Sequence, residues 1–186
     1  LPVLSALGLD PVHPFPRILT KSLNVVIALE GKDAFGRKGG MAIVRAPRSL
    51  PRVIQLPEEI SGGKHDFVFL SSVLTAFVDD LFPGMKVKGA YQFRVTRNSE
   101  LFVDEEEVEN LASALKNELL SRGFRPAVRL EIADNCPKSI VKLLLQNFEL
   151  KQNAVYRING PVNLSRVVQV YDRCNLPELK FPTFKA

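Results

Sequence analysis

The glycine-rich stretch at residues 31–40 carries the residue types that could hold a phosphate group. Gly31 and Gly36 have the separation of the two glycines in a phosphate-binding loop that follows a strand. That motif continues with Lys and then Ser or Thr and opens a helix, whereas here Arg37 and Lys38 lead into an extended apolar run. Without a helix N-terminus, the loop lacks the amides that bind phosphate in such sites. We therefore interpret the stretch as a hairpin loop.

Basic side chains within and just after this loop are the candidate contacts for a polyanion. They are Lys32, Arg37, Lys38, Arg45 and Arg48. The whole chain has 25 Lys and Arg against 20 Asp and Glu, which gives a net charge of +5 and a pI near 9.3. This excess is mild, so the loop either meets a polyanion or faces solvent. An independent polyanion- or RNA-binding module, to which Arg52 would also contribute, stays open as the alternative.

The other reactive side chains predict no catalytic, cofactor-binding or metal-binding residue. His13 and His65 are the two histidines, and neither has a His or Cys at the spacing of zinc ligands. The acidic run at residues 104–107 is explained by the first turn of a helix, where the helix dipole stabilises negative charge. Cys136 and Cys174 are too few for a disulfide framework, and neither has a His or basic residue at a spacing that would indicate an activated thiolate.

The elements that position these residues are organised around residues 86–123. Residues 86–96 alternate in the period-2 pattern of a strand with one buried face. That face carries Val87, Gly89, Tyr91, Phe93 and Val95. Residues 97–100 then predict a turn, and residues 101–103 a second strand. A helix is expected from Asp104 to Gly123, with an apolar stripe along one side.

Further strands and helices lie on both sides of this region. Strands are predicted at Ser22–Leu29, Met41–Arg45, Arg52–Leu56, Lys64–Leu70, Ala127–Ile132 and Val155–Ile158. In the strand at 127–132, one buried face is expected to carry Val128, Leu130 and Ile132. The strands and helices alternate irregularly, which is typical of an α+β fold with a mixed, largely antiparallel sheet and packed helices in a single domain.

Three further helices follow from apolar stripes at helical spacing. The first is capped by Ser71 or Ser72, runs through Leu81, and carries Val73, Leu74, Phe77, Val78 and Leu81. The second starts at Pro137 and carries Ile140, Val141, Leu144, Leu145 and Phe148. The last is capped by Asn163 and carries Leu164, Val167, Val168 and Tyr171.

Composition places the chain among globular proteins that can bury a large core. It has 186 residues, of which 46% are hydrophobic, and folding at this length buries roughly 70% of the surface of the unfolded chain. The absence of a signal peptide, of an apolar run of transmembrane length and of a disulfide framework predicts a cytoplasmic protein without a transmembrane segment. The chain begins in mid-phrase without Met, so we expect a fragment of a longer, multidomain chain.

Five phrases of the sequence together are more specific than any single motif. They are Leu9–Pro16, Leu50–Pro57, Phe93–Leu101, Tyr156–Leu164 and Leu179–Pro182. Their order and spacing resemble the middle, or head, domain of bacterial polyphosphate kinase. The resemblance covers essentially the whole chain, residues 1–186.

The resemblance implies a parent enzyme that transfers the ATP γ-phosphate to a growing polyphosphate through a phosphohistidine, with Mg²⁺. It places the phosphorylated histidine and the nucleotide- and metal-binding residues in domains that flank this segment. We therefore expect no catalytic residue and no cofactor in this segment itself. The expected partners are the flanking N-terminal and C-terminal domains and further copies of the parent in a homo-oligomer. Polyphosphate is a possible ligand, and no nucleic acid is expected.

Overall fold

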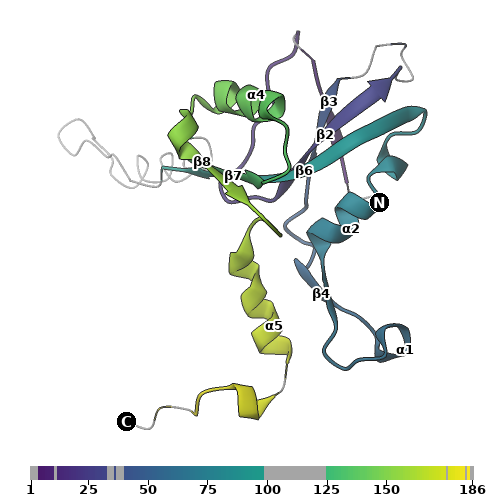
Figure 1. The fold of residues 1–186 in the computed structure, drawn as a ribbon, viewed down its shortest axis with the longest axis vertical. Helices are drawn as coiled ribbons and strands as arrows, with labels where there is room; N and C mark the ends of the chain where they lie inside the picture. Colours follow the sequence, from purple (N-terminus) through teal and green to yellow (C-terminus); the bar gives the residue numbers. More distant parts are fainter. Residues whose placement is uncertain are drawn as a thin grey trace, which may run out of the picture.

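A computed structural model describes residues 4–10, 12–32, 36, 40–98, 125–174, 176–182 and 184. A six-stranded sheet forms its body, in the order β1-β3-β2-β6-β7-β8 (Figure 1). The strands are β1 (Ala6–Leu9), β2 (Asn24–Gly31), β3 (Met41–Arg45), β6 (Met85–Arg97), β7 (Ala127–Ala133) and β8 (Val155–Ile158). All neighbours pair antiparallel except β7 and β8, which are parallel. The predicted α+β class with a mixed, largely antiparallel sheet is confirmed.

β6 is the longest strand, with 13 residues, and it pairs with β2 on one side and β7 on the other. Tyr91, Phe93 and Val95 face the helix-covered core as predicted, and Phe93 and Val95 are completely buried. The register with β2 shifts so that Lys88 has no partner, which is the pattern of a β-bulge. Val87 therefore packs in the cluster on the other side of the sheet, and the predicted face is wrong at this residue.

A second bulge corrects the face predicted for β7. Thr96 pairs with Arg129 and Arg97 with Ala127, which leaves Val128 without a partner. Val128 is 50% exposed, although Leu130 and Ile132 on the same predicted face are completely buried. A bulge inserts one residue and so turns the side chains beyond it.

Helix α4 (Lys138–Phe148) covers one face of the sheet. The five predicted stripe residues, Ile140, Val141, Leu144, Leu145 and Phe148, are all buried, as expected for an amphipathic helix on a sheet. The ring of Phe148 lies 6.2 Å from the ring of Phe93 and 5.4 Å from that of Phe15. Pro137 occupies the N-cap, one residue earlier than predicted.

The opposite face of β2 and β3 packs against α2 (Leu70–Ala76) and the 3₁₀ turn η1 (Asp79–Leu81). The prediction of one helix capped by Ser71 or Ser72 is wrong here. The helix starts after Phe69, no side chain caps it, and Ser71 is buried in its first turn. The α-helix ends at Ala76, and Phe77 is 55% exposed, whereas Val78 is buried and Leu81 of η1 packs against the same cluster as predicted.

A small second sheet pairs β4 (Val53–Gln55) with β5 (Phe67–Phe69). The short helix α1 (Glu58–Ser61) lies in the connection between them, to one side of the main sheet in Figure 1. Both predicted strands exist but are shorter than expected. Leu70, predicted as the end of the second one, is already helical.

The C-terminal segment leaves the body of the molecule after β8. The 3₁₀ turn η3 (Gln152–Ala154) precedes β8, and the strand is followed by η4 (Leu164–Val167), α5 (Val168–Arg173) and η5 (Pro177–Leu179). α5 extends away from the sheet in Figure 1. Asn163 precedes η4 with a φ of 77° and makes no capping hydrogen bond, which corrects the predicted cap.

The turn predicted at residues 97–100 starts too early, because Arg97 still belongs to β6. The rest of that turn from residue 99, the strand predicted at 101–103 and the helix predicted at 104–123 lie outside the described residues. Of the helices that the structure describes, none is long and apolar enough to cross a membrane.

Candidate functional site

The predicted basic contacts lie at two ends of the β2–β3 hairpin. The hairpin itself is confirmed, because β2 and β3 pair antiparallel and the Leu29 amide donates to the Gly40 carbonyl at 2.9 Å. Arg45 pairs with Asn24 at the start of β2, whereas Lys32 directly follows its end. Seven strand residues separate the two ends, which corresponds to roughly 23 Å. Lys32 therefore does not form a single patch with Arg45 and Arg48. Arg37 and Lys38 lie outside the described residues.

The Lys32 end of the hairpin also carries negative charge. Glu30 forms an ion pair with Lys88 on the neighbouring strand β6. The hydrogen bond and the charge of Lys88 lower the pKa of the Glu30 carboxyl below its ordinary value. The Lys88 and Glu30 side chains are 48% and 60% exposed, so solvent screens the pair. This end therefore presents a mixed charge distribution.

The other end of the sheet is rich in arginine. The Arg45 guanidinium donates to the Arg17 carbonyl at 3.5 Å, and the Arg48 guanidinium donates to the Thr20 carbonyl at 3.4 Å. Residues 17–20 form no strand, so their carbonyls need side-chain donors. Arg45 and Arg48, predicted as polyanion contacts, thus each have one structural contact to this segment.

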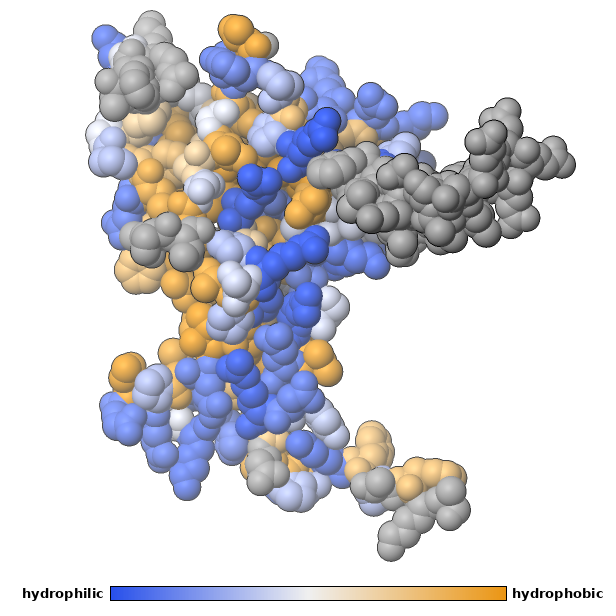
Figure 2. Space-filling model, turned by 180° about the vertical axis from the view of Figure 1, so that it is seen from behind, coloured by the Kyte–Doolittle hydropathy of each residue, from blue (hydrophilic) through white to orange (hydrophobic). Residues whose placement is uncertain are grey.

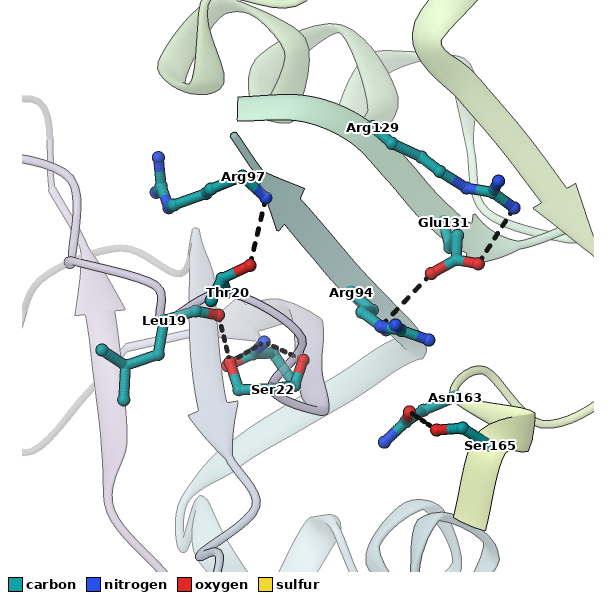
Figure 3. Close-up of polar contacts among 10 residues, drawn as sticks. Leu19, Thr20, Ser22, Arg94, Arg97, Arg129, Glu131, Asn163 and Ser165 are labelled. Atoms are coloured by element: carbon teal, nitrogen blue, oxygen red, sulfur yellow. Dashed lines mark hydrogen bonds and ion pairs between the residues drawn. The ribbon is translucent and has the colours of Figure 1, made fainter. Parts of the chain in front are cut away.

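Arg97 fixes the same segment more firmly. Its Nε and Nη2 atoms donate to the Ile18 carbonyl at 3.2 and 3.1 Å, and its Nη1 atom donates to the Arg125 carbonyl at 2.7 Å. The Arg97 amide also donates to the Thr20 hydroxyl at 3.1 Å (Figure 3). Burial lowers the pKa of its guanidinium below the ordinary value. Arg97 is therefore a structural residue that ties residues 17–20 to the end of β6.

Arg52 and Arg166, which are far apart in the sequence, line a small recess with Ser71 and Asn163. Arg52 stands just before β4 and donates from Nη2 to the Ala46 carbonyl at 3.1 Å. Its Nη1 atom is buried and has no hydrogen-bond partner among the described residues. Burial lowers the pKa of the Arg52 guanidinium, and the positive charges of Arg166 and Arg48 lower it further.

A third group of charges lies on the sheet face that α4 does not cover (Figure 3). Glu131 on β7 forms an ion pair with Arg94 on β6, with 3.4 Å between Oε2 and Nε, and it accepts a hydrogen bond from Arg129 at 3.1 Å. The Arg129 guanidinium also stacks over the Tyr156 ring, 3.9 Å from its centroid. Two cations share one carboxylate here, which leaves a net charge of +1. The alternation of β6 and β7 could have indicated these outward side chains, whereas nothing in the sequence links Arg166 with Arg52.

The described residues contain no group of three or more His, Cys, Asp or Glu side chains that could hold a metal ion. His13 is paired with Asp10, whose Oδ2 atom lies 3.4 Å from Nδ1, and its side chain is 72% exposed. Burial raises the pKa of the Cys136 thiol to about 11, so this cysteine is a neutral core residue at physiological pH.

Comparison with known proteins identifies the family. The model of the polyphosphate kinase middle domain matches residues 1–170. The chain belongs to the polyphosphate kinase family. It is 71% identical over 185 residues to a polyphosphate kinase of Xylella fastidiosa, and the match covers 99% of this chain and 26% of the relative. It is also 58% identical over 183 residues to a polyphosphate kinase of Neisseria meningitidis, covering 98% of this chain and 27% of the relative.

A solved structure shows the same fold. The crystal structure of polyphosphate kinase from Porphyromonas gingivalis matches with a TM-score of 0.71 and 18% identity, over 99% of this chain and 25% of that one. The chain thus spans about a quarter of the length of these relatives. The resemblance to the middle domain of the family is confirmed.

Proposed function

We propose that this chain is the noncatalytic middle domain of an ATP–polyphosphate phosphotransferase. In the parent enzyme it supports the flanking nucleotide-binding and catalytic domains and contributes to self-association in the cytoplasm. ATP and Mg²⁺ act in those flanking domains, and this segment supplies no ligand to either. The family and the fourfold greater length of its relatives support this proposal.

The observation that carries the proposal is an exposed apolar surface on the C-terminal segment, which we call the C-terminal apolar face. It consists of Leu164, Val167, Val168, Tyr171, Leu179, Phe181 and Phe184. These side chains are between 37% and 98% exposed. The first four, Leu164, Val167, Val168 and Tyr171, form the apolar stripe predicted for the last helix. The corresponding stripe of α4 is buried against the sheet. An apolar surface of this extent is typical of a region that another protein surface covers.

The shape of the segment supports the same conclusion. α5 has six residues, and helices this short are not stable in water without packing. Figure 1 shows it extending from β8 without a neighbouring element on its far side, and Figure 2 shows apolar side chains on the C-terminal segment away from the body. A covering domain of the parent enzyme would supply the missing contacts.

Hydrogen exchange tests this proposal directly. The amides of residues 164–174 should exchange at least about tenfold more slowly in the full-length enzyme that contains this segment than in the isolated chain, because local packing controls opening. The amides of α4 serve as the internal control, since their protection should be the same in both. Equal exchange of residues 164–174 in the two proteins would contradict docking.

A pair of variants tests the functional consequence. Val168→Ser removes an apolar side chain that is 59% exposed, and Val12→Ser makes the same change at a position that is 85% exposed and distant in sequence. In the isolated chain both should change the free energy of unfolding by less than about 0.5 kcal/mol. In the full-length enzyme only Val168→Ser should lower polyphosphate synthesis or the fraction of oligomer in light scattering.

A further inference from the structure

A small recess opens where the turn at residues 161–166 passes beside the starts of β4 and α2. Leu23 and Phe69 form part of its apolar wall, and Ser71 and Asn163 add polar groups. Its volume is about 10 Å³, close to the space of one water molecule. The recess can therefore admit a single oxygen atom of a ligand, whose remaining atoms would stay outside.

The recess contains an unused hydrogen-bond donor. Nη2 of Arg52 is engaged by the Ala46 carbonyl at 3.1 Å, which fixes the plane of the guanidinium. Nη1 is buried, and no described residue accepts a hydrogen bond from it. Buried polar groups in folded proteins nearly always have a partner, so a buried charged donor without one indicates an acceptor that binds there.

The charge around the recess is positive. Arg166 lines it together with Arg52, and Arg48 is near enough for its charge to act on the same guanidinium. Among the described residues no Asp or Glu forms an ion pair with any of the three. This differs from the nearby sheet face, where Glu131 pairs with two arginines. Three like charges that share one neighbourhood repel each other until an anion joins them.

We propose that Arg48, Arg52 and Arg166 form a binding site for the oxygen atoms of a phosphoryl group. A phosphoryl group carries more than one negative charge and several oxygens in a tetrahedral arrangement, so one oxygen can enter the recess while others meet the two outer guanidiniums. A single carboxylate carries one charge and leaves two of the three cations uncompensated. Arginine also matches phosphate geometry with its planar fork of donors.

Inorganic phosphate and the terminal unit of a polyphosphate chain have this chemistry in one group. An internal unit of the chain carries one negative charge, so there neighbouring units would supply the further charges. This proposal goes beyond the docking role proposed above and is independent of it, because the isolated chain would bind the anion without any flanking domain. Failure of docking would leave anion binding unchanged, and failure of anion binding would leave hydrogen exchange of the C-terminal apolar face unchanged.

Calorimetric titration of the purified chain with inorganic phosphate and, separately, with tripolyphosphate tests the site. Arg52→Gln should weaken binding by about tenfold, as expected for loss of a buried charge-assisted hydrogen bond. Arg166→Gln should weaken it by about threefold, because its side chain is exposed and screened. Arg173→Gln is the matched control, since Arg173 is also exposed and lies on α5 just beyond the recess residues.

Each result has a defined meaning. Weaker anion binding in Arg52→Gln and Arg166→Gln, with binding retained in Arg173→Gln, supports the site. The ligand that binds more tightly, inorganic phosphate or tripolyphosphate, shows which source of the phosphoryl group the site prefers. Circular dichroism checks folding. If Arg52→Gln is unfolded, Arg166→Gln alone decides, because the Arg166 side chain is exposed and makes no hydrogen bond or ion pair with another described residue. Equal loss in Arg173→Gln would show diffuse attraction and overturn the site. No binding of either ligand, or displacement by an equal concentration of succinate, would overturn it as well.

Discussion

Replacing Phe93 by alanine should remove the centre of the core between the sheet and α4. Phe93 is completely buried in the middle of β6, where its neighbours across the sheet are Asn24 and Ile132. Its ring lies 6.2 Å from the ring of Phe148 on α4, at an angle of 42°. Because strands hold it on both sides, the site can collapse only partly around the missing ring. The lost transfer free energy and the cavity together should cost about 3–5 kcal/mol.

Urea denaturation of the isolated chain measures this cost. The midpoint should fall while the dependence of the unfolding free energy on urea stays constant, which shows that stability and not compactness has changed. Phe77→Ala is the matched control, because Phe77 is 55% exposed beyond the end of α2, and it should cost less than about 1 kcal/mol. A loss below about 1 kcal/mol for Phe93→Ala, or equal losses for both variants, would refute the placement of β6 at the centre of the core.

Four further predictions follow from other regions. Gly89→Ala should destabilise the chain by about 1–3 kcal/mol in urea, because a Cβ at this position would collide with the Tyr91 ring on the same face of β6. Arg97→Ala should cost about 2–3 kcal/mol in the same assay, since the Ile18 and Arg125 carbonyls lose their donors, and Arg45→Ala, which removes one bond of 3.5 Å, should cost less than 1 kcal/mol. Stability should fall between about pH 9 and 11, because the Cys136 thiol ionises in the unfolded chain but stays protonated in the fold, where its pKa is about 11; Cys136→Ala should flatten this slope in melts across that range. If the loop at residues 31–40 meets polyphosphate, neutralising Lys32, Arg37 and Lys38 together should weaken binding and reduce its salt dependence, and an unchanged salt slope would show that the loop does not take part.

Periodicity predicted the parts of the fold in which one buried face runs through a whole element. α4 has its five stripe residues buried, because a helix on a sheet needs an apolar side at a spacing of three and four residues. The strand at residues 85–97 was predicted at residues 86–96 from the alternation of apolar and polar side chains along one buried face. Among the strands, the predicted faces failed at the two bulges, where Val87 and Val128 turn away from the predicted side. A bulge depends on pairing with a neighbouring strand, so alternation within one strand cannot indicate it.

The last predicted helix shows a different limit. Its apolar stripe is the same kind of signal as that of α4, yet Val168 is 59% and Tyr171 is 54% exposed. A stripe indicates that a helix face needs a partner, but it does not say whether the partner lies within the same segment. The sequence therefore indicated the apolar character of residues 164–171 but not whether this chain buries them.

The site residues were harder to predict than the fold. Lys32, Arg45 and Arg48 are close in sequence, but the hairpin places Lys32 at one end and the two arginines at the other. Arg52 and Arg166 are far apart in sequence, and the turn after β8 brings them to one recess. Charge clusters thus depend on topology, which single-sequence patterns do not specify.

The most direct test of the noncatalytic role is an attempt to phosphorylate the isolated chain. Incubation with Mg²⁺ and ATP labelled at the γ-phosphate, followed by an alkaline quench that preserves phosphohistidine, should give no labelled protein and no polyphosphate. The reason is that phosphoryl transfer needs a nucleophile, a clamp for the γ-phosphate and usually a metal, all converging on one centre. The described residues contain no group of three or more His, Cys, Asp or Glu side chains that could hold that metal. Stoichiometric label that is lost in His13→Ala or His65→Ala would contradict the account.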